Sequence, residues 1–169
     1  MSGVNRRHVG GAILGAFAAW LVVLGFSSLY SILLGFGPLD PFTGTGSVLG
    51  FQGTKALVLG LGLDFVIPLV AAIVFLLALA LLSRSQFTVL EFVSRARALG
   101  AGALLGLVVW AVFYIPVIYE LTHPTPSQFV GPLLFGFVDH LVFGAVIGLL
   151  IFLVGGPVPF ARRTMSPPT

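Results

Sequence analysis

The sequence predicts an all-α protein that crosses a membrane as a bundle of four helices. Only 8% of the 169 residues are charged and 58% are hydrophobic, whereas soluble proteins carry about 25% charged residues. The hydrophobic residues gather in four long runs, and a bilayer core of about 30 Å is crossed by about 20 helical residues. The predicted spans are residues 10–36, 56–82, 99–119 and 131–155.

The first run follows the basic pair Arg6 and Arg7. It is much longer than the apolar region of a signal peptide, which has about 7–15 residues, so we expect an uncleaved transmembrane helix. The stretch from Gly37 to Lys55 contains two prolines and many small polar residues. Prolines and glycines at this density are typical of turns, and we expect this stretch to form a loop.

The second run contains one carboxylate, Asp64, and one proline, Pro68. A proline removes the hydrogen bond to the carbonyl four residues earlier, so we expect a kink that frees the carbonyl of Asp64. Ahead of the third run, Thr88 and Glu91 have the spacing of a capping box, which predicts that this helix begins before the membrane does. The fourth run completes a single domain at residues 1–155, and the proline-rich tail at 156–169 is expected to be disordered and cytoplasmic.

The basic residues predict the orientation of the bundle. If the runs alternate in direction, seven of the eight basic residues fall on one side and Lys55 alone on the other. Basic loops stay in the cytoplasm, so we expect a multi-pass protein of the plasma membrane with both termini cytoplasmic. The formal charge of +3 is scattered and forms no continuous basic face, which argues against a nucleic-acid partner. The chain has no cysteine, which excludes disulfides and thiolate metal sites.

Three of the runs contain glycines spaced four residues apart, a step that lets helix backbones approach closely in lipid. The pairs are Gly11 and Gly15, Gly102 and Gly106, and Gly144 and Gly148. We favour packing within the chain, and a homo-oligomer or a larger membrane complex stays as the alternative. The order of basic residues, glycines and tryptophan is similar in residues 4–20 and 93–110, which indicates either two duplicated helix pairs or a chance likeness between apolar helices.

Ionisable residues inside the apolar runs are the main candidates for a functional site. A charged group at the bilayer centre costs about 2.5–3.5 kcal/mol or more, so such residues face the bundle interior and have partners. Aligning the second and fourth runs places Asp64 and His140 at the same depth, which predicts a pair. Asp139 points about 100° away from His140 on a helix and needs a partner of its own. Glu120 and His123 are expected to join this polar site from its outer rim.

Three functions are compatible with these residues. The first is a structural or accessory membrane component, in which Asp64 and His140 satisfy one another. The second is a proton- or cation-coupled transporter or channel-like protein that uses Asp64 and His140. The third is a membrane enzyme with a divalent metal such as Zn²⁺ or Mn²⁺ at Asp139 and His140. No cofactor is predicted apart from this divalent cation, and no hydrolase or nucleotide motif is present.

The fourth run also carries a resemblance to a known family. It contains Gly131-Pro132-Leu133-Leu134, followed by His140-Leu141-Val142-Phe143-Gly144-Ala145-Val146-Ile147-Gly148. In this run the chain resembles short four-helix prokaryotic membrane proteins of unknown function, of a kind common in archaea. The resemblance implies a four-helix architecture, and it brings no activity with it.

Overall fold

The computed structural model describes residues 4–83, 94–116 and 126–158 of the chain. Its helices are α1 (Arg6–Leu33), α2 (Asp40–Val48), α3 (Gly53–Leu82), α4 (Arg95–Val109), the π-helical turn η2 (Trp110–Tyr114) and α6 (Pro126–Gly155). Four helices, namely α1, α3, α4 with its continuation into η2, and α6, are long and apolar enough to cross a membrane. The predicted fold class, an all-α bundle of four membrane-spanning helices, is confirmed.

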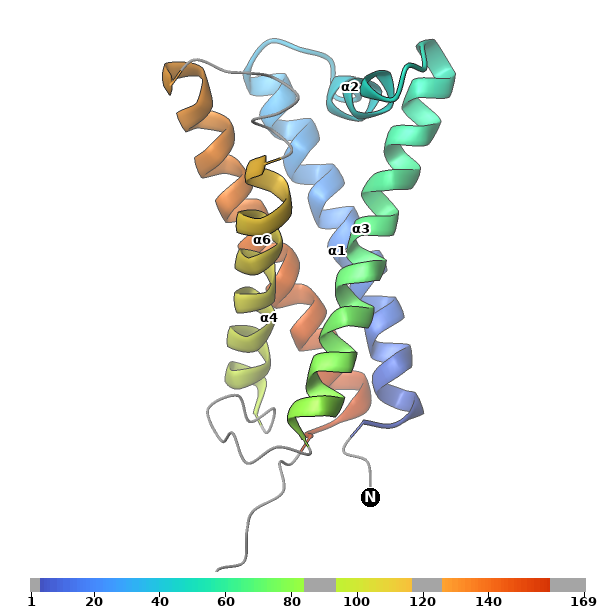
Figure 1. Ribbon diagram of the computed structural model, residues 1–169, viewed down its shortest axis with the longest axis vertical. Helices are drawn as coiled ribbons and strands as arrows, with labels where there is room; N and C mark the ends of the chain where they lie inside the picture. The colour runs from blue at the N-terminus through green and yellow to red at the C-terminus, as the bar shows by residue number, and fades with distance from the viewer. Residues whose placement is uncertain (1–3, 84–93, 117–125, 159–169) are drawn as a thin grey trace, which may run out of the picture.

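The long helix α6 holds the bundle together. It lies between α1 and α4 and packs extensively against both, whereas α3 packs against α1 and has few contacts with α4 (Figure 1). The short helix α2 lies across one end of the bundle and packs against α3. Large apolar side chains such as Ile13, Leu81 and Leu134 are exposed on the outside of the bundle. An exterior of this kind is stable in lipid and indicates a membrane protein.

The first helix begins before the apolar run does, because polar residues cap it. The Asn5 side chain accepts hydrogen bonds from the backbone N–H groups of Arg7 and His8, at 2.9 and 3.2 Å. The buried His8 ring closes the capping box, since its Nδ1 accepts from the Asn5 N–H at 3.1 Å, and its Nε2 donates to the Gly156 carbonyl at 3.1 Å. The helix therefore begins four residues before the predicted span.

The prediction of a loop between Gly37 and Lys55 is wrong, because α2 forms there. Its proline lies in the first turn, where no intrahelical N–H is needed. The Asp40 carboxylate accepts from the Gly37 N–H at 2.7 Å, and Thr45 donates its hydroxyl to the carbonyl of Pro41 at 3.0 Å. The helix ends before Gly50, whose φ of +84° suits glycine.

Small residues let α2 lie directly on α3. A Cβ added at Gly46 would meet the backbone of Ala56, and one added at Gly60 would fall on the Phe42 carbonyl oxygen. Phe42 is 1% exposed. The helical state of this sequence therefore depends on its contacts with α3 as well as on its own hydrogen bonds, and a local reading of its composition misses it.

The glycine steps found in the sequence lie at helix crossings within the chain. A Cβ at Gly102 would fall on the Gly144 carbonyl, and one at Gly106 on the His140 carbonyl. On the other side of α6, Gly11 and Gly15 lie against the backbone of its last turns, with 2.8 and 3.1 Å from their added Cβ positions to the nearest α6 atoms. These distances leave no room for side chains, so the helix axes approach closely at both crossings.

The later helices also differ from their predicted bounds. α4 begins at Arg95, where the Ser94 hydroxyl accepts from the Arg97 N–H at 3.3 Å, and it passes into the π-helical turn. α6 begins at Pro126, five residues before the predicted span. The tail is not free from residue 156 onward, because Val158 is completely buried in the core. The predicted capping box and the tail beyond residue 158 lie outside the described residues.

The two helix pairs expected from a duplication are not packed equivalently. A two-fold axis would make the contact of α3 with α4 match that of α1 with α6, yet the first contact is slight and the second is extensive. The bundle is therefore asymmetric, with α1, α6 and α4 as a tightly packed set and α3 attached through α1 and α2.

Candidate functional site

A cavity of about 470 Å³ lies inside the bundle, towards the end that α2 covers. Its wall is formed by residues of α1, α2, α3, η2 and α6. Most of this wall is aliphatic or aromatic. The polar side chains in it are Ser27, Tyr30, Thr45, Asp64, Tyr114, Asp139 and His140.

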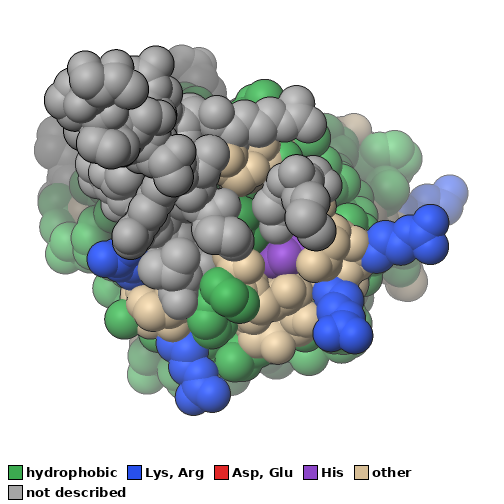
Figure 2. Space-filling model, turned by 90° about the horizontal axis from the view of Figure 1, so that it is seen from below, with side chains coloured by type: hydrophobic (Ala, Val, Ile, Leu, Met, Phe, Trp, Pro, Cys, Tyr) green, Lys and Arg blue, Asp and Glu red, His purple; other side chains and the backbone are tan. Residues whose placement is uncertain are grey.

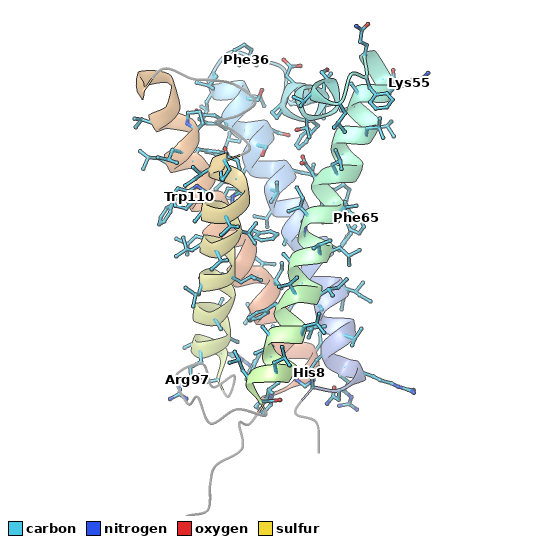
Figure 3. The ribbon with its side chains drawn as sticks, viewed as in Figure 1. His8, Phe36, Lys55, Phe65, Arg97 and Trp110 are labelled. Atoms are coloured by element: carbon cyan, nitrogen blue, oxygen red, sulfur yellow. The ribbon has the colours of Figure 1, made fainter. Side chains whose placement is uncertain are left out.

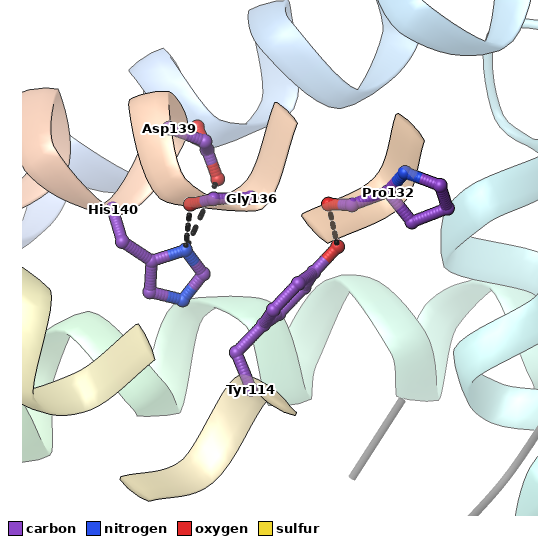
Figure 4. Close-up of polar contacts among 5 residues, drawn as sticks. All are labelled: Tyr114, Pro132, Gly136, Asp139 and His140. Carbon is purple, nitrogen blue, oxygen red and sulfur yellow. Dashed lines mark hydrogen bonds and ion pairs between the residues drawn. The ribbon is translucent and has the colours of Figure 1, made fainter. Parts of the chain in front are cut away.

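His140 is held in one orientation by its own helix and by η2. Its Nδ1 lies 2.8 Å from the Gly136 carbonyl oxygen and donates a hydrogen bond to it (Figure 4). The ring contacts the Tyr114 ring, with 4.9 Å between the centroids. Because Nδ1 carries the hydrogen, Nε2 of the neutral ring is left as an acceptor.

Asp139, which was expected to point about 100° away from His140, lies in the same cavity wall as His140. Its Oδ2 is 3.9 Å from the Nδ1 of His140 (Figure 4). Neighbouring positions on a helix differ by about 100° in direction. Asp139 and His140 nevertheless both line the cavity, which α6 borders on one side while it packs against α1 and α4. The residue is 5% exposed, and its Oδ1 is buried without a hydrogen-bond partner among the described residues.

Asp64 reaches the cavity from α3, and its position differs from the one expected. Within the described part of the chain, no hydrogen bond or ion pair joins it to His140, although both line the cavity. Asp64 shares the wall of this cavity with Asp139. The predicted carboxylate–imidazole pair is thus replaced by two carboxylates that share one cavity with an imidazole.

The described basic side chains lie at the two ends of the bundle and not in the cavity wall. Lys55 lies at the end covered by α2, and Arg97 lies at the opposite end (Figure 3). Two like charges in a medium of low dielectric constant repel one another strongly. No Lys or Arg side chain in the wall relieves this repulsion, so a proton or a bound cation must do so.

Tyr114 is a site residue that the sequence alone does not single out. Its hydroxyl donates to the Pro132 carbonyl at 3.2 Å (Figure 4). The ring occupies the space beside Gly136, where a Cβ would collide with it. The glycine four residues before His140 was the available signal, since it marks a place on α6 where another group comes close.

Thr45 and Tyr30 were also missed as cavity residues. Thr45 enters the wall only because α2 is a helix that covers the cavity. Tyr30 stacks on Phe135, with 4.2 Å between the ring centroids and 18° between the planes. Glu120 and His123, which were expected at the rim, lie outside the described residues.

The described residues do not provide the set of ligands that a metal site needs. No three histidine or carboxylate side chains among them lie close enough together to hold a metal ion. The alternative of a metal at Asp139 and His140 therefore gains no support from this geometry, because a Zn²⁺ site normally uses three or four protein ligands.

Comparison with protein-family models, with curated proteins and with solved structures found no match to this chain. The resemblance to short archaeal-type membrane proteins stays a prediction.

Proposed function

We propose that this protein is a multi-pass membrane carrier that binds a proton or a small cation, inorganic or organic, in its central cavity. Asp64, Asp139 and His140 supply the binding groups. The observation that carries the proposal is that two carboxylates share one largely apolar cavity whose wall contains no Lys or Arg side chain. A site with this charge pattern attracts cations and protons and repels anions.

A purely structural role explains these residues less well. In a structural or accessory component the buried polar groups satisfy one another, as expected for a pair of Asp64 and His140. Instead, the imidazole hydrogen bonds its own helix backbone, and Asp139 keeps a buried oxygen without a described partner. Such an oxygen costs about 1–3 kcal/mol or more when charged, and ionisable groups kept in a membrane at this cost generally serve transport.

The proposed orientation rests on the charges at the two ends of the bundle. Lys and Arg side chains surround the end from which α1 and α4 begin (Figure 2), and Lys55 is the basic residue described at the other end. Cytoplasmic ends of membrane proteins are enriched in basic residues. We therefore place both termini in the cytoplasm of a cell whose plasma membrane holds the protein, with the cavity nearer the outer surface.

The test is a flux measurement on the full chain in liposomes. A membrane potential is imposed, and proton entry is followed with a dye inside the vesicles, first in the absence and then in the presence of added monovalent cations. Wild type is expected to carry protons or cations, and Asp64→Asn and Asp139→Asn are expected to reduce the flux at least about tenfold. Asp40→Asn is the matched control, because Asp40 makes its hydrogen bond outside the cavity. Equal flux in all these variants, or no flux in wild type, would contradict the proposal.

A further inference from the structure

We infer that the ligand of the cavity is a protonated amine with an apolar body, such as an arylalkylammonium ion. This inference rests on the proposed function and names its substrate class. It follows from three features of the wall: the direction of its hydrogen bonds, the unpartnered carboxylate and the apolar surface around them.

The first feature is that three polar side chains of the wall direct their hydrogens to the backbone. His140 donates through Nδ1 to the Gly136 carbonyl at 2.8 Å, and the Tyr114 hydroxyl donates to the Pro132 carbonyl at 3.2 Å. Thr45 donates its hydroxyl to the Pro41 carbonyl at 3.0 Å. Each of these three side chains therefore keeps acceptor lone pairs for a ligand.

The second feature is the state of the carboxylates. An ionised carboxylate accepts hydrogen bonds and donates none. Asp139 is 5% exposed, and its Oδ1 has no partner within the described part of the chain. Asp64 is a second carboxyl group in the wall of the same cavity. The wall therefore lacks positively charged hydrogen-bond donors. An ammonium ion provides the positive charge, and its N–H groups are the donors.

The third feature excludes a bare inorganic ion as the best occupant. Ca²⁺ and Mg²⁺ require about six or more oxygen ligands, and the described residues contain no group of three metal-binding side chains. Much of the wall is instead apolar and aromatic, with Phe135 stacked on Tyr30 and Phe143 beside His140. Aromatic faces attract organic cations, and apolar surface stabilises a hydrocarbon body.

The size of the cavity agrees with this class. Pockets for small organic ligands have volumes of about 300–1,000 Å³, and this cavity has about 470 Å³. A proton or a dehydrated metal ion would leave most of that space to water against apolar walls. A ring with a short ammonium chain fills it and brings its charged end to the carboxylates.

The experiment measures binding to the purified full chain in detergent by titration calorimetry at neutral pH. The probes are phenethylammonium, its uncharged analogue 2-phenylethanol, benzyltrimethylammonium, which is a cation without N–H groups, and Na⁺ and Mg²⁺ as chlorides. Phenethylammonium is expected to bind with one site per chain. We expect the other probes to bind at least about tenfold more weakly, because each lacks the charge, the donors or the apolar body.

The variants test which residues hold the amine. Asp139→Asn and Asp64→Asn are expected to weaken phenethylammonium binding at least about tenfold, and Thr45→Val about threefold, while Asp40→Asn binds as wild type does. Thermal unfolding of each variant establishes that it is folded, and Thr45→Val provides a cavity change that leaves all charges in place. Equal binding of 2-phenylethanol, or unchanged binding by the folded carboxylate variants, would overturn the inference.

The flux and binding experiments can contradict the carrier and the amine site independently of one another. Phenethylammonium binding without flux in liposomes leaves the amine site standing and removes the carrier. Proton or Na⁺ flux that depends on Asp64 and Asp139, in a protein that does not bind phenethylammonium, leaves the carrier standing and removes the amine.

Discussion

Replacing Gly106 by alanine tests the contact that fixes α4 against α6. A Cβ at this position would fall on the His140 carbonyl oxygen and lie 3.3 Å from the Cα of Gly144. Both neighbours are backbone atoms of a buried helix, so neither moves aside as the end of a flexible side chain does. The two helices must separate, and the packing on both sides of the crossing is lost.

The magnitude follows from two opposing effects. Alanine is preferred over glycine inside a helix by about 1 kcal/mol. Overpacking of a well-packed core costs about 1–3 kcal/mol, and here the crossing also opens, so a net loss of about 2 kcal/mol is expected. Gly100→Ala on the same helix is the matched control, because nothing lies within 4 Å of its added Cβ. That variant is expected to equal or exceed the stability of wild type.

Unfolding in detergent followed by tryptophan fluorescence measures the effect, since Trp110 adjoins this crossing in sequence and Trp20 reports on α1. For a chain of about 150–250 residues, 1 kcal/mol shifts Tm by about 2–4 °C. Gly106→Ala is therefore expected to melt about 4–8 °C below wild type and further below Gly100→Ala. A Tm of Gly106→Ala at or above that of Gly100→Ala would refute the close crossing of α4 and α6.

Three further predictions address other parts of the chain. Gly60→Ala is expected to push α2 away from α3, because its Cβ would fall on the Phe42 carbonyl, and cleavage by a protease added on the α2 side should become at least about tenfold faster. His8→Ala is expected to lower stability by about 2–3 kcal/mol, since the variant loses a buried ring and its hydrogen bond to Gly156; an unchanged Tm would contradict this. The chain has no cysteine, so Lys55→Cys gives a single thiol, and an impermeant maleimide should label it in intact cells if the α2 end is outside.

The sequence predicts the long helices because the helical state of each one depends on the hydrophobicity of its own residues. A run of about 20 apolar residues is stable in lipid only as a helix, whatever its neighbours are. Their ends are less predictable, since Asn5 and Pro126 extend α1 and α6 beyond the apolar runs. Helix α2 is the larger miss. Its glycines and hydroxyl residues favour turns locally, and its helical state depends on the contacts of Gly46 and Gly60 that only the folded bundle provides.

The sequence predicts which residues belong to the site better than it predicts which of them contact one another. Asp64, Asp139 and His140 were identified because charge inside an apolar run is costly and therefore rare. Their pairing was inferred from depth along two helices, which does not determine which helices touch. The structure brings Asp64 into the same cavity as Asp139 and His140, and the His140 imidazole donates to the Gly136 carbonyl of its own helix.

The packing divides the polar site between two parts of the bundle. Asp139 and His140 belong to α6, which is fixed on both sides by crossings where glycines leave no space, and the Gly106 crossing includes the His140 carbonyl itself. Asp64 belongs to α3, which packs mainly against α1 and α2 and only slightly against α4. The separation of the two carboxylates is therefore determined by the contacts of α3 with α1 and α2, and not by the glycine crossings. Gly60→Ala should accordingly change ligand binding more than Gly106→Ala does for the same loss of stability.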